Sequence, residues 1–268
     1  MKLLTMRLMT VLILSTIMLP LCSVAYTFAP SIVTLRTAGA ASSCFFKLEN
    51  KEMKAVAVEV TINSCSKDID GKTIQGKDAE KDFIIYPAQV VLMPGDETGV
   101  QVRWIGEETL KTEQTYTIVA RQVPVPTEKD KKQEDNKVHV QVTVLVNYEG
   151  RLYVAPKGAK AEVVIESAAE QPQPVKTAGN TSTNIVIAML EIVCANKGTA
   201  HMDMATATLI LTPVNKAGAT TKQRSISLTV KEAPCLKTHL LAGDRRRFVF
   251  PRPQALPAGP FEASIGDL

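Results

Sequence analysis

Short stretches of alternating or β-branched residues follow one another along most of the chain, and helical periodicity is missing. In the first half these stretches are SCFFKLEN, AVAVEVTI, DFIIYP, QVVLMP, TGVQVRWI, TYTIVARQVPV and VHVQVTVLV. In the second half they are AEVVIESA, NIVIAMLEIVCAN, TATLILTPV, RSISLTV and RRFVFP. Gly, Pro, Asn, Asp or charge clusters separate them, as is usual between strands. Many short strands at regular spacing predict an all-β protein made of sandwiches or barrels.

The stretch VHVQVTVLV has the most regular alternation. Valine takes every second position, at Val138, Val140, Val142, Val144 and Val146. Successive side chains leave a strand on opposite faces, so the valines form one apolar stripe. The charged stretch from Thr127 to Lys137 precedes it, and its lack of apolar residues predicts disorder in the free protein. The stripe is either buried inside an ordinary sandwich or kept open for another chain.

The first 25 residues have a different pattern. A basic start, MKLLTMR, leads into the apolar LMTVLILSTIMLP and then into the small residues Ser23 to Ala25 before Tyr26. This order is typical of a secretory signal peptide, and the apolar part is short for a membrane span. Leu21 stands before Cys22 where a lipoprotein site needs a small residue. We predict a cleaved signal peptide at 1–25 and no membrane insertion of the mature chain; an uncleaved anchor and a lipidated Cys22 are the alternatives.

The strand pattern pauses between Ala155 and Lys160, where Pro156 and Gly158 interrupt it. The chain that follows the signal peptide is long enough for two domains of ordinary size, each with its own core. We therefore predict one domain over residues 26–156 and a second, similar one over 157–268.

Apart from Cys22, the chain has an even number of cysteines: Cys44, Cys65, Cys194 and Cys235. In an exported protein this favours disulfides over metal ligation or free thiols. Four cysteines allow three pairings. The pairs Cys44–Cys65 and Cys194–Cys235 close the shorter loops and fit two domains that fold separately.

The residues that usually carry chemistry form no recognisable site. His139, His201 and His239 do not lie at a metal-ligand spacing, and no nucleotide-binding, hydrolase or zinc-protease motif is present. The HMDM stretch at His201 is interpreted as a strand edge rather than a soft copper site. The formal net charge is only +4, and the basic cluster Arg245 to Arg247 lacks interleaved aromatics. The sequence predicts no enzyme, no metal, no cofactor and no nucleic-acid partner.

A series of short motifs follows in a fixed order between about residues 30 and 156. The motifs are Tyr86-Pro87, Pro94-Gly95, Val102-Arg103, Tyr116 with Val123-Pro124, and Arg151-Leu152-Tyr153. Together with the charged stretch and the valine strand, this succession resembles the first domain of the periplasmic pilus (fimbrial) assembly chaperones of the chaperone–usher pathway.

The resemblance implies two immunoglobulin-like β-sandwich domains that meet in an L or boomerang shape around a cleft. The long strand would then lie at a sheet edge and complete a pilus subunit that lacks a strand, a form of β-augmentation called donor-strand complementation. The five valines would enter the subunit's groove, and Leu145 would pack inward on the chaperone's own core. The implied partners are pilus subunits and an outer-membrane usher, and the implied location is the periplasm.

The same resemblance assigns a role to Arg151, which matches the family's basic residue that anchors the subunit's C-terminal carboxylate. The family's second basic anchor would fall near Thr34, which is uncharged, and Arg36 is the proposed substitute. Ala155 and Gln122 stand where the family has interdomain ion-pair residues, so the domain angle must be fixed in another way.

Two other functions remain open from the sequence. One is an exported immunoglobulin-like adhesin or pilus-associated structural protein, and the other is a disulfide-stabilised module for a small ligand. A carbohydrate-binding adhesin would need several aromatic side chains in a pocket, and 5% aromatic residues with a single Trp are poor material for one.

Overall fold

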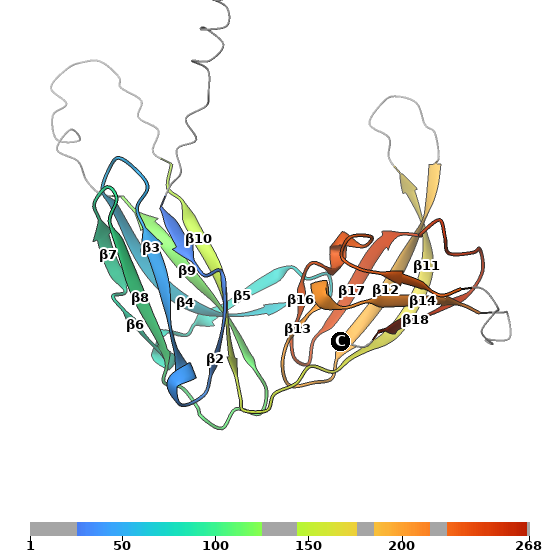
Figure 1. Ribbon diagram of the computed structural model, residues 1–268, viewed down its shortest axis with the longest axis horizontal. Coiled ribbons are helices and arrows are strands. Elements are labelled where there is room, and N and C mark those ends of the chain that lie inside the picture. Colours follow the sequence, from blue (N-terminus) through green and yellow to red (C-terminus); the bar gives the residue numbers. More distant parts are fainter. Residues whose placement is uncertain (1–25, 125–143, 176–184, 215–223, 267–268) are drawn as a thin grey trace, which may run out of the picture.

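The computed structural model describes residues 26–124, 144–175, 185–214 and 224–266. Within these ranges the protein consists of strands and short 3-10 helices, which confirms the all-β prediction. Figure 1 shows two β units that are joined at an angle. The predicted signal peptide, the charged stretch, and Val138, Val140 and Val142 lie outside the described residues.

The first unit is a sandwich of two sheets. One has the order β1-β3-β8-β6, and the other has the order β2-β10-β9-β4-β5, with β7 also paired to β4. The strands are β1 (Thr27–Ala29), β2 (Ile32–Arg36), β3 (Ser43–Glu49), β4 (Val56–Lys67), β5 (Thr73–Asp78), β6 (Phe83–Tyr86), β7 (Gln89–Leu92), β8 (Glu97–Trp104), β9 (Gln114–Val123) and β10 (Asn147–Ala155). The 3-10 helices are η1 (Ala40–Ser42) and η2 (Glu80–Asp82).

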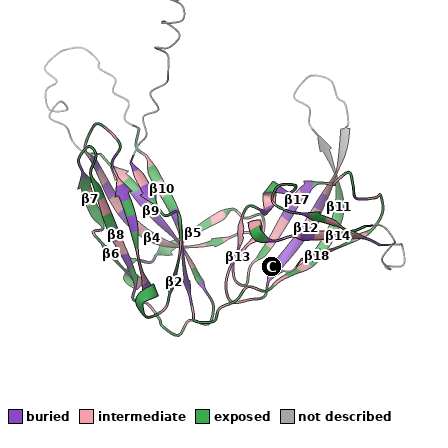
Figure 2. Ribbon diagram, viewed as in Figure 1, coloured by how far each residue is buried: buried purple, intermediate pink, exposed green. Residues whose placement is uncertain are grey.

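The core of this unit follows from the alternation of the strands. Every second residue of β4, from Val56 to Ile62, is buried between the sheets (Figure 2). Phe83 and Trp104 meet edge to face at 5.1 Å, and Phe83 and Tyr116 do so at 4.9 Å. These ring pairs add to the area that the strands bury.

Two of the places where the chain changes sheets in the first unit have a cis X-Pro bond. Between β1, which pairs with β3, and β2, which pairs with β10, the bond is Ala29–Pro30. Between β6, which pairs with β8, and β7, which pairs with β4, it is Tyr86–Pro87. The first change brings β2 alongside the end of β10.

The second unit has its own sheets and its own core. The sheets are β11-β12-β17, β15-β14-β18 and the short pair β13-β16. The strands are β11 (Val163–Val175), β12 (Ile185–Asn196), β13 (Met202–Asp203), β14 (Leu209–Pro213), β15 (Ile226–Leu228), β16 (His239–Leu240), β17 (Arg245–Pro251) and β18 (Phe261–Ile265). The 3-10 helices are η4 (Met204–Thr206) and η5 (Pro234–Leu236).

Two separate clusters of buried side chains correspond to the two units. The first runs from Tyr26 to Val154, and the second, with the side chains packed against it, from Ala161 to Ile265. The segment between them holds Pro156 and Gly158, the latter with a φ of +79°. No helix among the described residues is long and apolar enough to cross a membrane.

The structure contradicts the predicted disulfides. Cys44, Cys65, Cys194 and Cys235 are all free thiols. Cys44 lies on β3 and Cys65 on β4, in opposite sheets of the sandwich. Cys194 is buried in the second core, and Cys235 packs against that core from η5. The even number of cysteines and the predicted export favoured disulfides. A disulfide needs two Cβ atoms about 3.8 Å apart, and the spacing of cysteines along the chain does not determine that distance.

Candidate functional site

Strand β10 has two neighbours, and they do not cover the same length of it. β9 pairs with it antiparallel from Asn147 to Val154, whereas β2 pairs with it only from Arg151 to Ala155. Within the part of the chain that the structure describes, the first half of β10 therefore has a partner on one side only. This half is an open sheet edge, a place where another strand can pair.

The direction of the backbone groups along β10 follows from two hydrogen bonds. Arg151 N donates to Ser31 O at 2.7 Å, on the β2 side, and Gln122 N donates to Val146 O at 3.3 Å, on the β9 side. Because these directions alternate along a strand, the N–H and C=O groups of Leu145, Asn147 and Glu149 point to the open side. These groups can form the main-chain ladder of an added strand.

The side chains at the start of β10 correct the sequence interpretation. Val146 is partly buried and packs against the first core, on the same face as the buried Leu152 and Val154. Leu145 is 41% exposed, so the prediction that it packs inward is wrong. Alternation fixes which residues share a face but not which face the core covers, and Val146 lies on the core-facing side. Val144 is 76% exposed and has no such cover.

The base of the valine stripe is held in place by two polar side chains. The buried Tyr26 hydroxyl donates to Ala120 O at 2.6 Å and to Val146 O at 3.2 Å. Burial raises the pKa of Tyr26 to about 12, so the hydroxyl keeps its proton. Gln122 Oε1 accepts a bond from Val146 N at 3.0 Å. Gln122 therefore positions the start of β10 rather than the second domain.

Arg151 is partly buried where β10 meets the cleft between the units. Its Nη1 donates to Cys65 Sγ at 2.7 Å and to Thr117 Oγ1 at 3.0 Å, and its Nη2 lies 3.4 Å from Thr73 Oγ1. No ion pair among the described residues involves Arg151. The guanidinium is thus oriented by uncharged partners and keeps its charge for a ligand.

A cavity of about 520 Å³ opens beside Arg151 and has walls from both units. The first unit contributes Ile32 and Lys67, and the second contributes Asp203, Lys237 and His239. Lys67 Nζ donates to Thr238 Oγ1 at 3.3 Å and lies 3.5 Å from His239 O. Burial, and then the charge of Arg151, lowers the pKa of Lys67. Lys67 is thus a second cation close to Arg151.

The structure does not bring Arg36 to this cavity. Its Nη1 donates to Pro156 O at 3.2 Å, and it pairs in register with Ala155. Four residues separate that position from Arg151, which is about 13 Å along a strand. The substitute proposed from the sequence is therefore wrong. The β2 residue directly beside Arg151 is the uncharged Ile32.

Two contacts that the sequence did not predict join the units. The first is the tip of the β4–β5 hairpin, which reaches β17 (Figure 1). Arg247 N donates to Ile69 O at 2.7 Å, and Arg247 Nε lies 3.1 Å from Asp70 Oδ1. Gly71 has a φ of +82°, and a Cβ there would fall 1.1 Å from Arg246 Nη1. The positive φ favours glycine here, and any side chain would also have to displace the Arg246 guanidinium.

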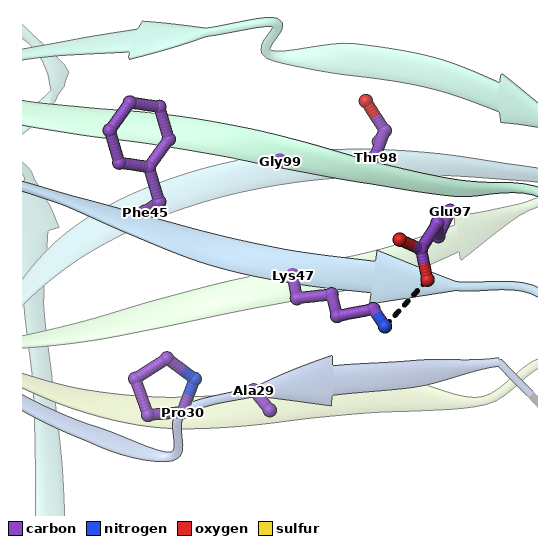
Figure 3. Close-up of a pocket in the computed structure, with 7 residues that line it drawn as sticks. All are labelled: Ala29, Pro30, Phe45, Lys47, Glu97, Thr98 and Gly99. Carbon is purple, nitrogen blue, oxygen red and sulfur yellow. Dashed lines mark ion pairs between the residues drawn. The ribbon is translucent and has the colours of Figure 1, made fainter.

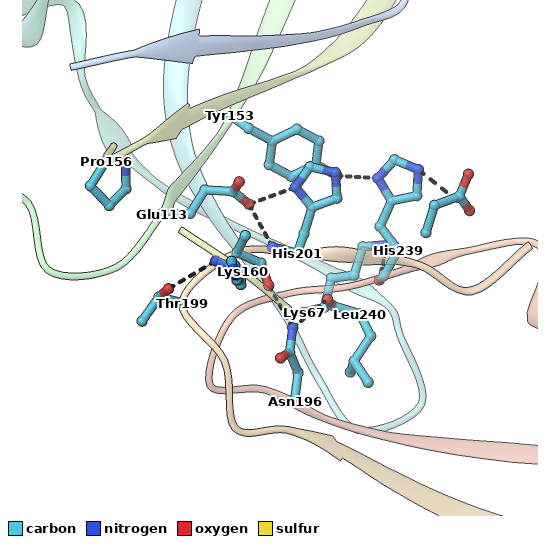
Figure 4. Close-up of polar contacts among 12 residues, drawn as sticks. Lys67, Glu113, Tyr153, Pro156, Lys160, Asn196, Thr199, His201, His239 and Leu240 are labelled. Carbon is cyan, nitrogen blue, oxygen red and sulfur yellow. Dashed lines mark hydrogen bonds and ion pairs between the residues drawn. The ribbon is translucent and has the colours of Figure 1, made fainter. Parts of the chain in front are cut away.

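The second contact is a stack of three rings at the linker side of the cleft (Figure 4). The Tyr153 and His201 rings lie 3.8 Å apart and nearly parallel, and His201 and His239 lie 5.0 Å apart. The Tyr153 hydroxyl is 2.6 Å from His239 Nδ1, and His201 Nδ1 is 2.7 Å from the buried Glu113 Oε1. The sequence spacing of the histidines gave no sign of this cluster, because distant segments supply it.

A second hollow, of about 540 Å³, lies on the outer face of the other sheet of the first unit (Figure 3). Its only ion pair joins two exposed side chains, Lys47 Nζ and Glu97 Oε2, at 2.6 Å. Phe45, 65% exposed, forms its apolar wall. Nothing among its seven lining residues is arranged for catalysis.

A comparison with known families gives a match over the whole first unit. Residues 28–160 match the family described as "Pili and flagellar-assembly chaperone, PapD N-terminal domain". The chain belongs to the pilus assembly chaperones. None of the curated proteins matches this chaperone in sequence.

Solved structures extend the likeness over both units. The class 5 fimbriae chaperone CfaA superposes with a TM-score of 0.54 and 9% identity, over 91% of this chain and 99% of that one. A chain of a chaperone–tip adhesin complex of CFA/I fimbriae biogenesis gives 0.53 and 9%, over 90% of this chain and 98% of that one. The shared fold confirms the prediction of two immunoglobulin-like sandwiches.

Proposed function

We propose that this chaperone binds pilus subunits by donor-strand complementation, with the strand that leads into β10 as the donor. The observation that carries the proposal is the open edge of β10 from Asn147 to Gly150, with the exposed Val144 beside it. An extended segment of a subunit would pair with this edge through main-chain hydrogen bonds. The chaperone's apolar side chains would enter the groove of the subunit.

The energy of such capture comes mainly from the valines. A buried valine contributes about 1.5 kcal/mol or more, whereas an exposed ion pair contributes about 0–1 kcal/mol. Val138, Val140, Val142 and Val144 are the proposed groove-filling residues. Val146, partly covered by its own core, would form the base of the stripe rather than a full groove contact. Valine suits this task because its χ1 is stiff and loses little freedom on docking.

The cleft would bind the end of the subunit chain. Arg151 can present two parallel N–H donors to a carboxylate, which fixes register as well as charge. We propose that Lys67, and not Arg36, supplies the second positive charge. Its position in the same cavity as Arg151 and its burial beside that residue support this assignment.

The family places this protein among pilus chaperones, and we propose the periplasm as its location and an outer-membrane usher as the recipient of its subunits. The signal-peptide pattern at 1–25 supports export. The related chain from the CFA/I chaperone–tip adhesin complex supports a subunit partner.

Co-expression with a pilin-like subunit tests the proposal. We expect the two proteins to co-purify as a one-to-one complex, because the valine stripe would fill the subunit's open groove. The matched control is the same subunit with an extra strand fused to its end, which fills its own groove. Equal capture of both subunits would contradict strand donation and favour a structural or adhesive role for this protein.

A further inference from the structure

The ring stack between the two domains has no part in the proposed strand donation, yet it contains two histidines in contact across the interface. Tyr153 comes from β10 of the first domain, and His201 and His239 come from the second. All three rings are nearly parallel, with interplanar angles of 16° for Tyr153–His201 and 12° for His201–His239. The stack lies beside the cavity that holds Arg151.

The protonation states at neutral pH follow from the surroundings. Burial raises the pKa of Tyr153, so its hydroxyl keeps its proton and donates. Burial, and then the positive charges of His201, Lys67 and Arg151, lowers the pKa of His239, while Asp203 acts in the opposite direction. Neutral His239 therefore accepts the 2.6 Å bond from Tyr153 at Nδ1.

We propose that the bond between Tyr153 and His239 is a pH-sensitive latch, which fixes the angle between the domains at neutral pH and releases it in mildly acidic solution. A protonated His239 carries N–H groups at both ring nitrogens. Its Nδ1 then becomes a donor, so the Tyr153 hydroxyl must turn and accept, and this reversed bond holds a charged ring in a half-buried site.

The charges that face His239 reinforce the release. Lys67 from β4 and Arg151 from β10 are cations on the first domain, and His201 is a third positive group when it is protonated. The single acid among the described residues that faces the ring is Asp203, at 3.9 Å from Nε2 and 46% exposed. Glu113 bonds to His201 and not to His239. His239 therefore has no buried carboxylate as a partner among the described residues.

The direction of the pH dependence follows from linkage. A histidine whose pKa is lowered in the closed form binds a proton more readily in the open form, where its pKa returns toward 6.5. The latch is thus fully effective above pH 6.5 and weakens as the pH falls below that value. One proton changes the ratio of closed to open molecules by at most about tenfold per pH unit.

The hairpin contact should survive this change and act as the pivot. The bond from Arg247 N to Ile69 O is made by backbone groups that do not titrate. Opening would therefore widen the cleft at the linker side, where Lys67 and Tyr153 contact the second domain, and would separate Lys67 from Thr238.

The test is an interdomain distance measured on the full mature protein, with one fluorescent label on each domain, at pH 7.5 and 5.5. We expect the wild type to open as the pH falls. His239→Asn is expected to stay closed at both values, because its amide oxygen accepts the Tyr153 bond and cannot be protonated in this range. Tyr153→Phe is expected to lose most of the response, because the bond is absent at both values.

His201→Asn is the matched control, since it removes the other histidine and leaves the latch bond intact. We expect it still to open as the pH falls, with a smaller response than the wild type because one of the charges that face His239 is gone. An unchanged distance in the wild type, or a response lost in His201→Asn and kept in His239→Asn, would overturn the proposal. If a variant does not fold, nitrogen-15 NMR of the wild-type histidines decides between the same outcomes. A His239 ring that titrates with no change in the Tyr153 contact would also overturn it.

Discussion

Replacement of Val144 by glutamate is expected to abolish subunit capture and to leave the free chaperone folded. Val144 is 76% exposed, so the free protein loses almost no packing. In the complex the change removes about 1.5 kcal/mol or more of apolar burial and adds the cost of a buried carboxylate, several kcal/mol. Affinity should fall more than about 100-fold, as each 1.4 kcal/mol is a factor of ten. Binding to a purified subunit and thermal unfolding of the free chaperone measure the two effects.

The matched control is Leu145→Glu. Leu145 is also exposed, and in a donated strand it would point to the face opposite Val144. The same charge one residue further along should therefore reduce affinity much less. Equal losses from the two variants would show that strand parity is irrelevant and would count against groove filling. Unfolding of the Val144→Glu protein would instead place this valine in the chaperone's own core.

Arg151→Gln is expected to weaken capture about 10- to 100-fold, because the variant loses a charge-assisted hydrogen bond to the subunit. Such a bond contributes about 1.5–3 kcal/mol. Thermal stability should change little, because Arg151 has no anionic partner among the described residues and its neighbours Thr117 and Cys65 tolerate an amide. Titration of the subunit against both proteins gives the ratio of affinities, and a subunit amidated at its C-terminus should abolish the difference.

One variant of Lys67 and one variant of Arg36 test which of the two residues is the second anchor. Lys67→Met keeps the length of the side chain and removes its charge, and it should weaken capture in the same direction as Arg151→Gln. Arg36→Gln should bind as the wild type does, since Arg36 contacts Pro156 instead of the cavity. The reverse order of effects would restore Arg36 as the anchor.

Much of the fold was predictable because the first domain repeats one physical rule. The inward residues of β4 and β8 are apolar at every second position, so the strands and their buried faces could be assigned from the sequence. The pause at Pro156 and Gly158 coincides with the segment between the two cores. Very short strands such as β13 and β16 were not predicted, since two residues carry no alternation.

The site was predicted less completely, because its parts meet through tertiary structure. Arg151 could be assigned from its place after the valine strand, and it does line the cleft. Lys67 could not, because only the long β4–β5 hairpin brings it there. The positions of Leu145 and Arg36 were wrong for a related reason. A sequence gives the parity of a strand, but the register with β2 and the face toward the core come from the fold.

The sequence carries the weakest signals for the contacts that fix the angle between the domains. His201 and His239 are far apart in the chain and join only when β13 pairs with β16. The glycine at the hairpin tip could have suggested a tight approach, yet nothing in the sequence names Arg246 as the group that fills the space.

The central claim is that the open half of β10 and the residues leading into it become a strand of another protein's sheet. Amide hydrogen exchange on the chaperone, free and bound to a subunit, measures this at individual residues. The N–H groups of Leu145, Asn147 and Glu149 should exchange readily in the free protein and become strongly protected in the complex. Tight binding with unchanged exchange at all three amides would contradict the account.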